Sequence, residues 1–185
     1  MENNLIKFNN VSKSFPGILA NNNVSFEITN NSVHALLGEN GAGKSTLVKI
    51  LCGILEHDSG EIFFDGKIFL AKSPAEARKL GIGMVFQHFS LFDSLTVAEN
   101  LILGLDEKIS FNKLKIKVET LSSKYELPLD LEAPITTLSA GEKQRVEIIR
   151  ILLQDPKLLI MDEPTSVLTP QEVEKLFITL DRLIK

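Results

Sequence analysis

The stretch that decides the fold is Val33-His34-Ala35-Leu36-Leu37-Gly38-Glu39-Asn40-Gly41-Ala42-Gly43-Lys44-Ser45. Its last eight residues fit the phosphate-binding pattern of Gly, four residues, Gly, Lys and Ser or Thr. The glycines let the backbone fold tightly, so that successive amides point at phosphates, and the following helix adds the positive end of its dipole. We therefore expect a strand over residues 33–37, a phosphate-binding loop, and then a helix.

The last two residues of this pattern carry specific chemistry. Lys44 is expected to neutralise the β- and γ-phosphates of a bound nucleotide, and the hydroxyl of Ser45 is expected to bind Mg²⁺. The position of the loop, after an apolar run and before a helix, favours this interpretation over an ordinary Gly-rich turn.

A second stretch, Leu158-Leu159-Ile160-Met161-Asp162-Glu163, reads as a buried strand that ends in two acids. The carboxylate of Asp162 can hold Mg²⁺ directly or through water. Glu163 can polarise an attacking water, which is general-base work. Taken alone, the two acids could equally cap the next element, but beside a phosphate-binding loop the catalytic interpretation is favoured.

A third stretch, Leu138-Ser139-Ala140-Gly141-Glu142, opens a helix whose free amides and Ser hydroxyl can bind an anion. The same residues also fit an ordinary capping box, in which Ser or Thr is followed three residues later by Glu. Three other pairs fit the box: Ser73 with Glu76, Thr96 with Glu99, and Thr169 with Glu172.

The composition excludes several classes of protein. A chain of 185 residues fits one domain with perhaps a sub-domain, and 24% charged residues argue against disorder. The net charge of −4 does not indicate a basic nucleic-acid-binding face. The single cysteine, Cys52, excludes an internal disulfide framework. No apolar run approaches the roughly 18 residues of a membrane-spanning helix, so we expect a soluble, cytoplasmic protein.

Short β-rich runs alternate with amphipathic helices, which predicts a parallel sheet with covering helices. Strands are expected over residues 5–11 and 24–28, a hairpin over 61–70, and buried parallel strands over 82–86 and 158–161. The early strands are expected to form an antiparallel layer. The Asn-rich residues 21–23 read as a solvated turn, and residues 96–153 as a helical insertion. The last helix is expected to bury Val173, Leu176, Phe177, Leu180 and Ile184.

Together these motifs resemble the ATP-binding cassette ATPases over essentially the whole chain. Residues 38–46 stand as Walker A, 138–142 as the signature, and Asp162 with Glu163 closes Walker B. Gln87 falls where the family has its Q-loop glutamine, and Phe15 where it stacks an aromatic on adenine. The resemblance implies a P-loop NTPase fold of class α/β over residues 1–185, with a parallel core, an antiparallel β layer and a helical sub-domain at about 90–150.

The resemblance also implies roles for single residues. It implies an ATPase with ATP and Mg²⁺ as ligands, in which Glu163, Gln87 and Lys44 are catalytic and Ser45, Gln87 and Asp162 hold the metal. The nucleotide contacts it implies are Phe15, Gly38, Glu39, Asn40, Gly41, Ala42, Gly43, Lys44, Ser45, Thr46, Ser139 and Gly141.

Finer details resemble the ATPases of simple-sugar and nucleoside importers. The segments that carry this resemblance are residues 15–17, 33–40 and 167–172. Gln87-His88-Phe89 is more similar to the nucleoside members. This branch implies a second cassette in a head-to-tail dimer, membrane-embedded permease subunits, and indirectly an extracytoplasmic solute-binding protein. No nucleic-acid partner is implied. The expected location is the cytoplasm, peripherally on the inner face of the cell membrane.

The chain departs from the family pattern at three places. Ala140 and Glu142 replace a Gly and a Gln of the common signature, and Thr169 stands where many relatives have Asp. The family's switch histidine falls beyond Lys185, so we expect the gene product to continue to that histidine and to a second cassette. Two alternatives stay open: a non-transport cassette protein acting on ribosomes or DNA, and a regulatory nucleotide binder that does not hydrolyse.

Overall fold

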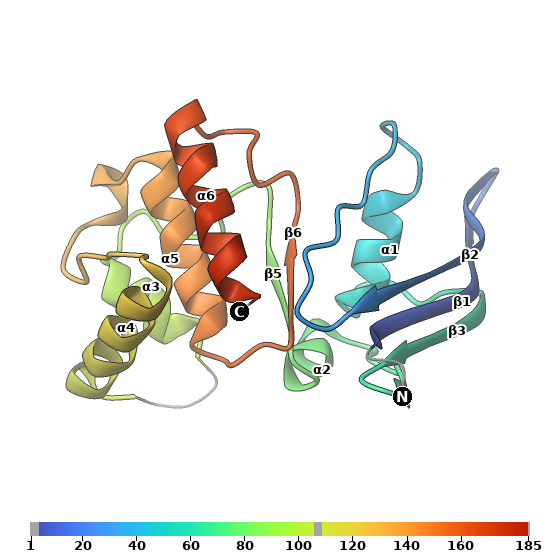
Figure 1. Ribbon diagram of the computed structural model, residues 1–185, viewed down its shortest axis with the longest axis horizontal. Coiled ribbons are helices and arrows are strands. Elements are labelled where there is room, and N and C mark those ends of the chain that lie inside the picture. Colours follow the sequence, from blue (N-terminus) through green and yellow to red (C-terminus); the bar gives the residue numbers. More distant parts are fainter. Residues whose placement is uncertain (1–3, 106–108, 185) are drawn as a thin grey trace. The chain divides into compact units, whose positions relative to one another are not determined.

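The computed structural model describes residues 4–105 and 109–184. It divides into two compact units, one of residues up to 82 together with Ile184, and one of residues 83–183. Figure 1 labels most of their helices and strands. Each unit is described by itself.

Unit 1 is built on a four-stranded antiparallel sheet. Strands β1 (Asn4–Phe15) and β2 (Ile18–Thr29) pair along nearly their whole length, and β3 (Ser59–Phe64) pairs with the other edge of β1. The short strand β4 (Lys67–Ile68) follows β3 through the turn at Asp65 and Gly66, which gives the order β2-β1-β3-β4. The predicted antiparallel layer and hairpin are confirmed.

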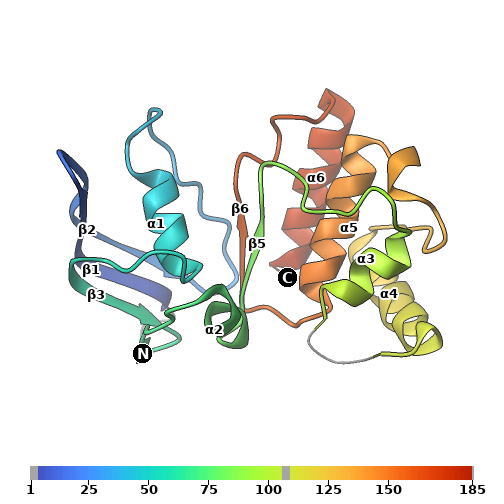
Figure 2. The same cartoon turned by 180° about the vertical axis from the view of Figure 1, so that it is seen from behind.

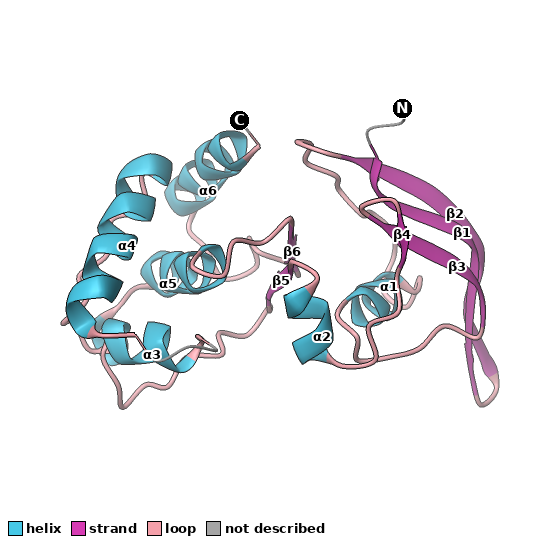
Figure 3. Ribbon diagram, turned by 90° about the horizontal axis from the view of Figure 1, so that it is seen from below, coloured by secondary structure: helices cyan, strands magenta, loops and turns pink. Residues whose placement is uncertain are grey.

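Two helices belong to unit 1. Helix α1 (Lys44–Leu51) lies on the concave side of the sheet, as Figure 3 shows. Helix α2 (Pro74–Lys79) begins with a proline in its first turn, where no helical hydrogen bond is lost. The core of this unit is formed by side chains of β1, α1 and β3, with Ile6, Phe8, Val11, Leu47, Ile50, Ile62 and Phe64 all buried.

The prediction of a strand over residues 33–37 is wrong. This segment has no regular secondary structure, and neither sheet of the described residues includes it. Its apolar side chains are exposed, with Val33 at 55%, Leu36 at 39% and Leu37 at 87%. An apolar run becomes a strand only when a neighbouring strand pairs with its backbone, and the sequence pattern does not specify that neighbour.

Unit 2 contains a parallel pair, β5 (Ile82–Val85) and β6 (Leu158–Met161), which lie side by side in Figure 1 and Figure 2. The two strand positions are confirmed, and Ile82 and Val85 are buried as expected. The expected burial of β6 is wrong, since all four of its residues are only half-buried. Its pairing with a single strand explains this, because the other edge has no partner in the described sheet.

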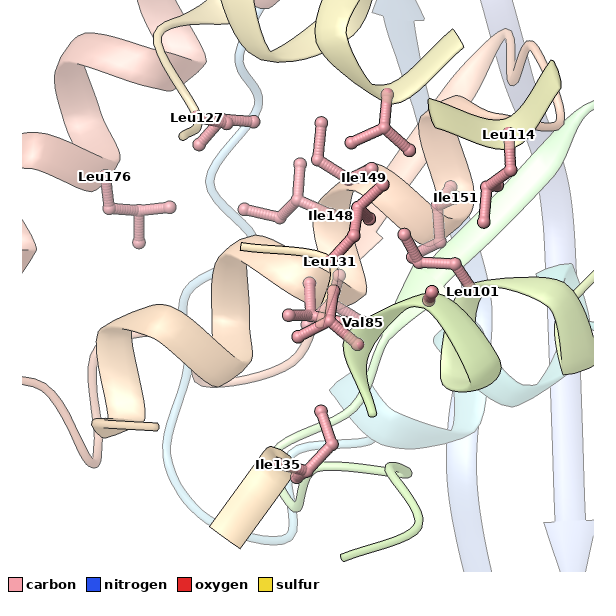
Figure 4. Packing of buried hydrophobic residues seen from close by; sticks show 14 residues of the cluster. Val85, Leu101, Leu114, Leu127, Leu131, Ile135, Ile148, Ile149, Ile151 and Leu176 are labelled. Carbon is pink, nitrogen blue, oxygen red and sulfur yellow. The ribbon is translucent and has the colours of Figure 1, made fainter. Parts of the chain in front are cut away.

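The segment between β5 and β6 folds as helices, as predicted. It contains α3 (Val97–Leu103), α4 (Phe111–Tyr125), the short 3₁₀ helix η1 (Ile135–Thr137) and α5 (Ala140–Leu152). Helix α6 (Pro170–Leu183) follows β6. Their apolar faces meet in one cluster, shown in Figure 4, that includes Val85, Leu101, Leu114, Leu127, Leu131, Ile135, Ile148, Ile149, Ile151 and Leu176.

The apolar face predicted for α6 is only partly correct. Leu176 is 5% exposed, whereas Phe177 is 56% exposed. Successive helical residues are about 100° apart, so a face centred on Leu176 and Thr179 turns Phe177 outward. Val173, Leu180 and Ile184 are half-buried. In the described part of the chain, no helix has the length and hydropathy needed to cross a bilayer.

The predicted capping boxes form reciprocally at three helices. Thr96 pairs with Glu99, Ser139 with Glu142, and Thr169 with Glu172. At α2 the hydroxyl of Ser73 accepts from the amide of Glu76, but the Glu76 carboxylate takes the amide of Lys72 instead of that of Ser73.

Candidate nucleotide-binding site

The phosphate-binding loop has the backbone that its glycines permit. Gly41 and Gly43 have φ values of 84° and 86°, in the left-handed region that favours glycine. The amide of Ala42 donates to the carbonyl of Glu39 at 3.1 Å, which closes the loop upon itself. Gly43 forms the N-cap of α1 without a side-chain cap, so no side chain of the cap residue satisfies the first amides of this helix.

Gly43 is required for a second reason, namely a close approach to β2. A Cβ atom at this position would lie 2.3 Å from the carbonyl oxygen of Ala20 and 2.5 Å from Nδ2 of Asn21. Asn21 is only 4% exposed and donates from Nδ2 to the carbonyl of Gly43 at 3.2 Å. The expectation that Asn21 lies in a solvated turn is therefore wrong. Asn21 lies inside β2, and the local sequence gave no signal of its contact with Gly43.

Lys44 lies over its own loop. Its Nζ atom donates to the carbonyl of Gly38 at 2.6 Å and to that of Glu39 at 2.8 Å. Ser45, the next residue, is exposed. The ammonium group, the uncapped start of α1 and an exposed hydroxyl thus gather at one end of the helix, a combination that suits a polyanion with a hard cation.

Phe15 ends β1 and is 40% exposed, so its ring is available to a flat ligand. The preceding residues are fixed by Asp58, which accepts from Lys13 Nζ at 2.6 Å and from the amide of Ser14 at 2.7 Å. These hydrogen bonds, that of Lys13 first, hold the pKa of Asp58 well below its usual range. Lys13 Nζ also lies 5.8 Å from the centre of the Phe15 ring.

In unit 2 the structure brings two predicted catalytic residues together. Gln87, two positions after β5, donates from Nε2 to Oε2 of Glu163 at 2.8 Å. Asp162 is half-buried, and its amide donates to the carbonyl of Val85 at 3.0 Å, which aligns the ends of β5 and β6. Glu163 has φ 44°, a left-handed conformation that costs energy for a residue with a side chain and recurs at functional sites.

Gln144 supports this turn from α5, a role that sequence reasoning missed. It is 5% exposed and donates from Nε2 to the carbonyl of Pro164 at 2.7 Å. The position of Gln144, two residues after the signature, gave no signal of this contact, because Gln144 and Pro164 are 20 positions apart.

The predicted anion site at the start of α5 holds a carboxylate of the chain itself. The amide of Gly141 donates to Oε1 of Glu172 at 3.0 Å, and the hydroxyl of Ser139 donates to the same oxygen at 3.3 Å. A Cβ at Gly141 would lie 2.4 Å from this oxygen, so only glycine allows the approach. Hydrogen bonds, those from Thr169 foremost, lower the pKa of Glu172. Sequence reasoning identified Glu172 only as a cap of α6.

The predicted site residues fall in both units. Phe15 and the phosphate-binding loop with Thr46 belong to unit 1, whereas Gln87, Ser139, Gly141, Asp162 and Glu163 belong to unit 2. The oxygen donors proposed for a metal, the Ser45 hydroxyl, the Asp162 carboxylate and the Gln87 amide, are of the chemical type that Mg²⁺ prefers.

Comparison with known proteins establishes the family. Residues 21–166 match the family described as ABC transporter. This match includes the phosphate-binding loop, Gln87, the signature residues, Asp162 and Glu163. The chain therefore belongs to the ABC transporter family.

Curated relatives carry the names of importer subunits. The guanosine import ATP-binding protein NupO of Bacillus subtilis is 44% identical over 98% of this chain and 36% of its own length. The ribose import ATP-binding protein RbsA of Hahella chejuensis is 43% identical over 95% of this chain and 36% of its own length. The chain thus spans little more than a third of the relatives it matches.

Solved structures agree on the fold. The cbiO1 protein from Clostridium perfringens, described as part of an ABC transporter complex, has a TM-score of 0.87 at 32% identity, over 99% of this chain and 74% of its own. The ATP-binding cassette MJ0796, solved as a dimer bound to ADP and Pi, has a TM-score of 0.79 at 28% identity, over 97% of this chain and 83% of its own.

Proposed function

We propose that this chain binds and hydrolyses ATP as the energy-supplying cassette of an importer for a small solute, a simple sugar or a nucleoside. The single observation that carries the proposal is the geometry at the start of α1. There Lys44 Nζ lies on two loop carbonyls, and Gly43 caps the helix without a side chain.

Phosphate binding follows from this geometry. The loop amides and the dipole of α1 attract the phosphates, and the ammonium group of Lys44 can move from its two carbonyl acceptors to the β- and γ-oxygens. Phe15 offers an exposed ring on which adenine can stack. The two carbonyls released by Lys44 are exposed, so that water can replace the lost hydrogen bonds.

Ser45, Asp162 and Gln87 are the residues proposed to hold Mg²⁺. When bound, this ion neutralises part of the charge that develops on the phosphoryl group. Asp162 would supply a carboxylate oxygen to this ion, and Ser45 and Gln87 would supply neutral oxygens.

Hydrolysis is assigned to Glu163, which takes a proton from the attacking water. The hydrogen bond from Gln87 to Oε2 orients the carboxylate and leaves Oε1 for the water.

The signature residues are assigned to a nucleotide on a second cassette, in a head-to-tail dimer. In this chain the Ser139 hydroxyl and the Gly141 amide donate hydrogen bonds to the Glu172 carboxylate, which supports an anion-binding role for them. The names of the importer relatives support a role in uptake, with permease subunits at the inner face of the membrane and a solute-binding protein outside. They also favour ribose-like sugars or nucleosides as the transported solute.

Titration with ATP in the presence of Mg²⁺ tests the proposal. Lys44→Ala should weaken ATP binding at least about tenfold, because it removes the side-chain cation of the loop. Lys49→Ala, which removes an exposed cation from the last turn of the same helix, is the matched control and should change affinity little. Equal affinities of the wild type and the Lys44 variant would refute the site.

A further inference from the structure

Glu147 is a fully buried carboxylate on α5, outside the motifs that the proposed function uses. It is 0% exposed. Its Oε1 atom accepts three hydrogen bonds: from the amide of Ser90 at 2.7 Å, from the hydroxyl of Ser90 at 2.9 Å and from Arg150 Nη2 at 3.0 Å. A buried charge with this many partners holds its neighbours in one geometry.

Arg150 completes the cluster from the next turn of α5. Its Nη1 atom donates to the carbonyl of Ser90 at 3.0 Å, and its Nη2 atom donates to the hydroxyl of Ser90 at 2.7 Å. The amide, carbonyl and hydroxyl of Ser90 are therefore all bound to two side chains of α5. Gly104, at the end of α3, makes room for this arrangement, because a Cβ there would lie 2.7 Å from Cγ and Cδ of Arg150.

Ser90 lies three residues after Gln87, in a segment without regular secondary structure. The same segment is bound again at Phe92, whose amide donates to Asn100 Oδ1 at 2.7 Å and whose carbonyl accepts from Asn100 Nδ2 at 3.1 Å. Asn100 is 1% exposed on α3. The loop between β5 and α3 is thus fixed at two points, and the one nearer to Gln87 is Ser90.

Burying the Glu147 carboxylate has a desolvation cost that lowers the stability of the fold. Oε2 of Glu147 is buried and has no hydrogen-bond partner among the described residues. An apolar side chain of similar size would avoid this desolvation cost, and replacing buried ion pairs with apolar residues is often neutral or stabilising. Fold stability alone therefore does not account for a carboxylate at this position.

We propose that Glu147 is a positioning residue for Gln87. Through Ser90 it fixes the segment that carries Gln87, so that Nε2 of Gln87 meets Oε2 of Glu163. This inference rests on the proposed function, in which Glu163 takes a proton from water. It assigns to α5 a second task besides presenting the Ser139 hydroxyl and the Gly141 amide.

Helix α5 connects the Ser90 cluster with Ser139 and Gly141. Glu147 lies about two turns after Ser139 on the same rigid element, so a shift of the start of α5 moves the Ser90 cluster with it. Binding of an anion to Ser139 and Gly141 would thereby change the position of Gln87. Hydrogen bonds join α5 to Ser90 and Gln87 to Glu163, and the backbone of the two intervening residues joins Gln87 to Ser90.

The test compares ATP affinity and turnover of this chain with substitutions at Glu147. Glu147→Ala should lower kcat by about tenfold or more while ATP affinity changes less than about twofold, because misplaced groups cost rate rather than phosphate binding. Glu147→Gln keeps an oxygen for the amide of Ser90, so it should recover most of the lost kcat. Glu119→Gln, the same change on an exposed face of α4, is the matched control.

Two further variants keep the test decisive if Glu147→Ala unfolds. Glu147→Met combined with Arg150→Met should fold at least as stably as the wild type, since it removes both members of the ion pair together, and still lose kcat. Gly104→Ala touches neither charge but displaces Arg150, and it should lower kcat in the same way. Circular dichroism melts establish the folded state of each variant.

The outcomes separate the two proposals. If Glu163→Gln abolishes turnover while folded Glu147→Ala and the double Met variant turn over at the wild-type rate, Glu147 has no positioning role and the proposed function stands. If Glu163→Gln also turns over at the wild-type rate, the proposed function fails and this inference with it. A parallel loss of ATP affinity and kcat would mean a structural role only.

Discussion

Gln87 donates a hydrogen bond from Nε2 to Oε2 of Glu163 at 2.8 Å, although the two residues are 76 positions apart in the chain. The contact exists because β5 and β6 are neighbours and each ends just before one of the two residues. A neutral donor on the carboxylate orients it without adding charge. The pair is therefore suited to hold one water in place for attack.

Replacing Gly43 with Ala should destabilise the fold more than replacing Gly41. Both glycines have left-handed φ values, but only at Gly43 does an added Cβ meet other atoms within 4 Å. Gly41→Ala should cost about 1 kcal/mol of unfolding free energy from backbone strain alone. Gly43→Ala should cost clearly more, about 3 kcal/mol, because it also collides with β2. Denaturant melts measure both values, and equal costs would refute the close approach to Asn21.

The Glu172 carboxylate should make stability depend on pH. Its pKa is lowered from the ordinary value of 4.5 by hydrogen bonds from Thr169, Gly141 and Ser139. A lowered pKa means that the ionised group stabilises the fold above its ordinary pKa and that this contribution is lost as the pH falls through the folded-state value. Wild type should thus exceed Glu172→Gln in unfolding free energy near neutral pH.

The difference in unfolding free energy between the wild type and Glu172→Gln should decrease steadily as the pH falls below the ordinary pKa of Glu172. Chemical denaturation at a series of pH values from about 7 to about 3 measures it. Glu174→Gln, a change at an exposed position on the same helix, is the control. A gap that stays constant over this range would show that the carboxylate of Glu172 is not bound at the start of α5.

Removing the ring of Phe15 should weaken ATP binding without affecting a ligand that lacks a base. Phe15→Ala is expected to lower ATP affinity about three- to tenfold, the value of one aromatic stacking contact. Binding of inorganic triphosphate should stay unchanged. Phe177→Ala removes a more exposed ring from α6 and should leave both affinities as they are. Isothermal titration measures the affinity of each ligand for the wild type and for both variants. An equal loss of affinity for both ligands in Phe15→Ala would contradict stacking on the base.

Local sequence patterns were sufficient for much of the fold. The glycines and Lys44 specify a tight loop at the start of a helix because their conformational and charge requirements lie within a few residues. The three reciprocal capping boxes likewise involve residues three apart. The hairpin at Asp65 and Gly66 depends on a turn whose residues are adjacent, and it was predicted for the same reason.

Interactions between distant segments could not be predicted in this way. Residues 33–37 have the composition of a strand, yet pairing depends on a partner elsewhere in the chain. Asn21 supports Gly43 across 22 positions, and Glu172 reaches Gly141 across 31. In each case the side chain has an ordinary local role, in a strand or a helix cap, that conceals the second one.

Release of phosphate from ATP by this chain and by Glu163→Gln is the most direct test of the central claim. The substitution keeps the size of the side chain and an acceptor for Gln87, but it removes the group that takes the proton. The account predicts that the variant binds ATP with Mg²⁺ as tightly as the wild type and that its turnover falls by at least about a hundredfold. Phosphate release at the wild-type rate from the variant would contradict the account.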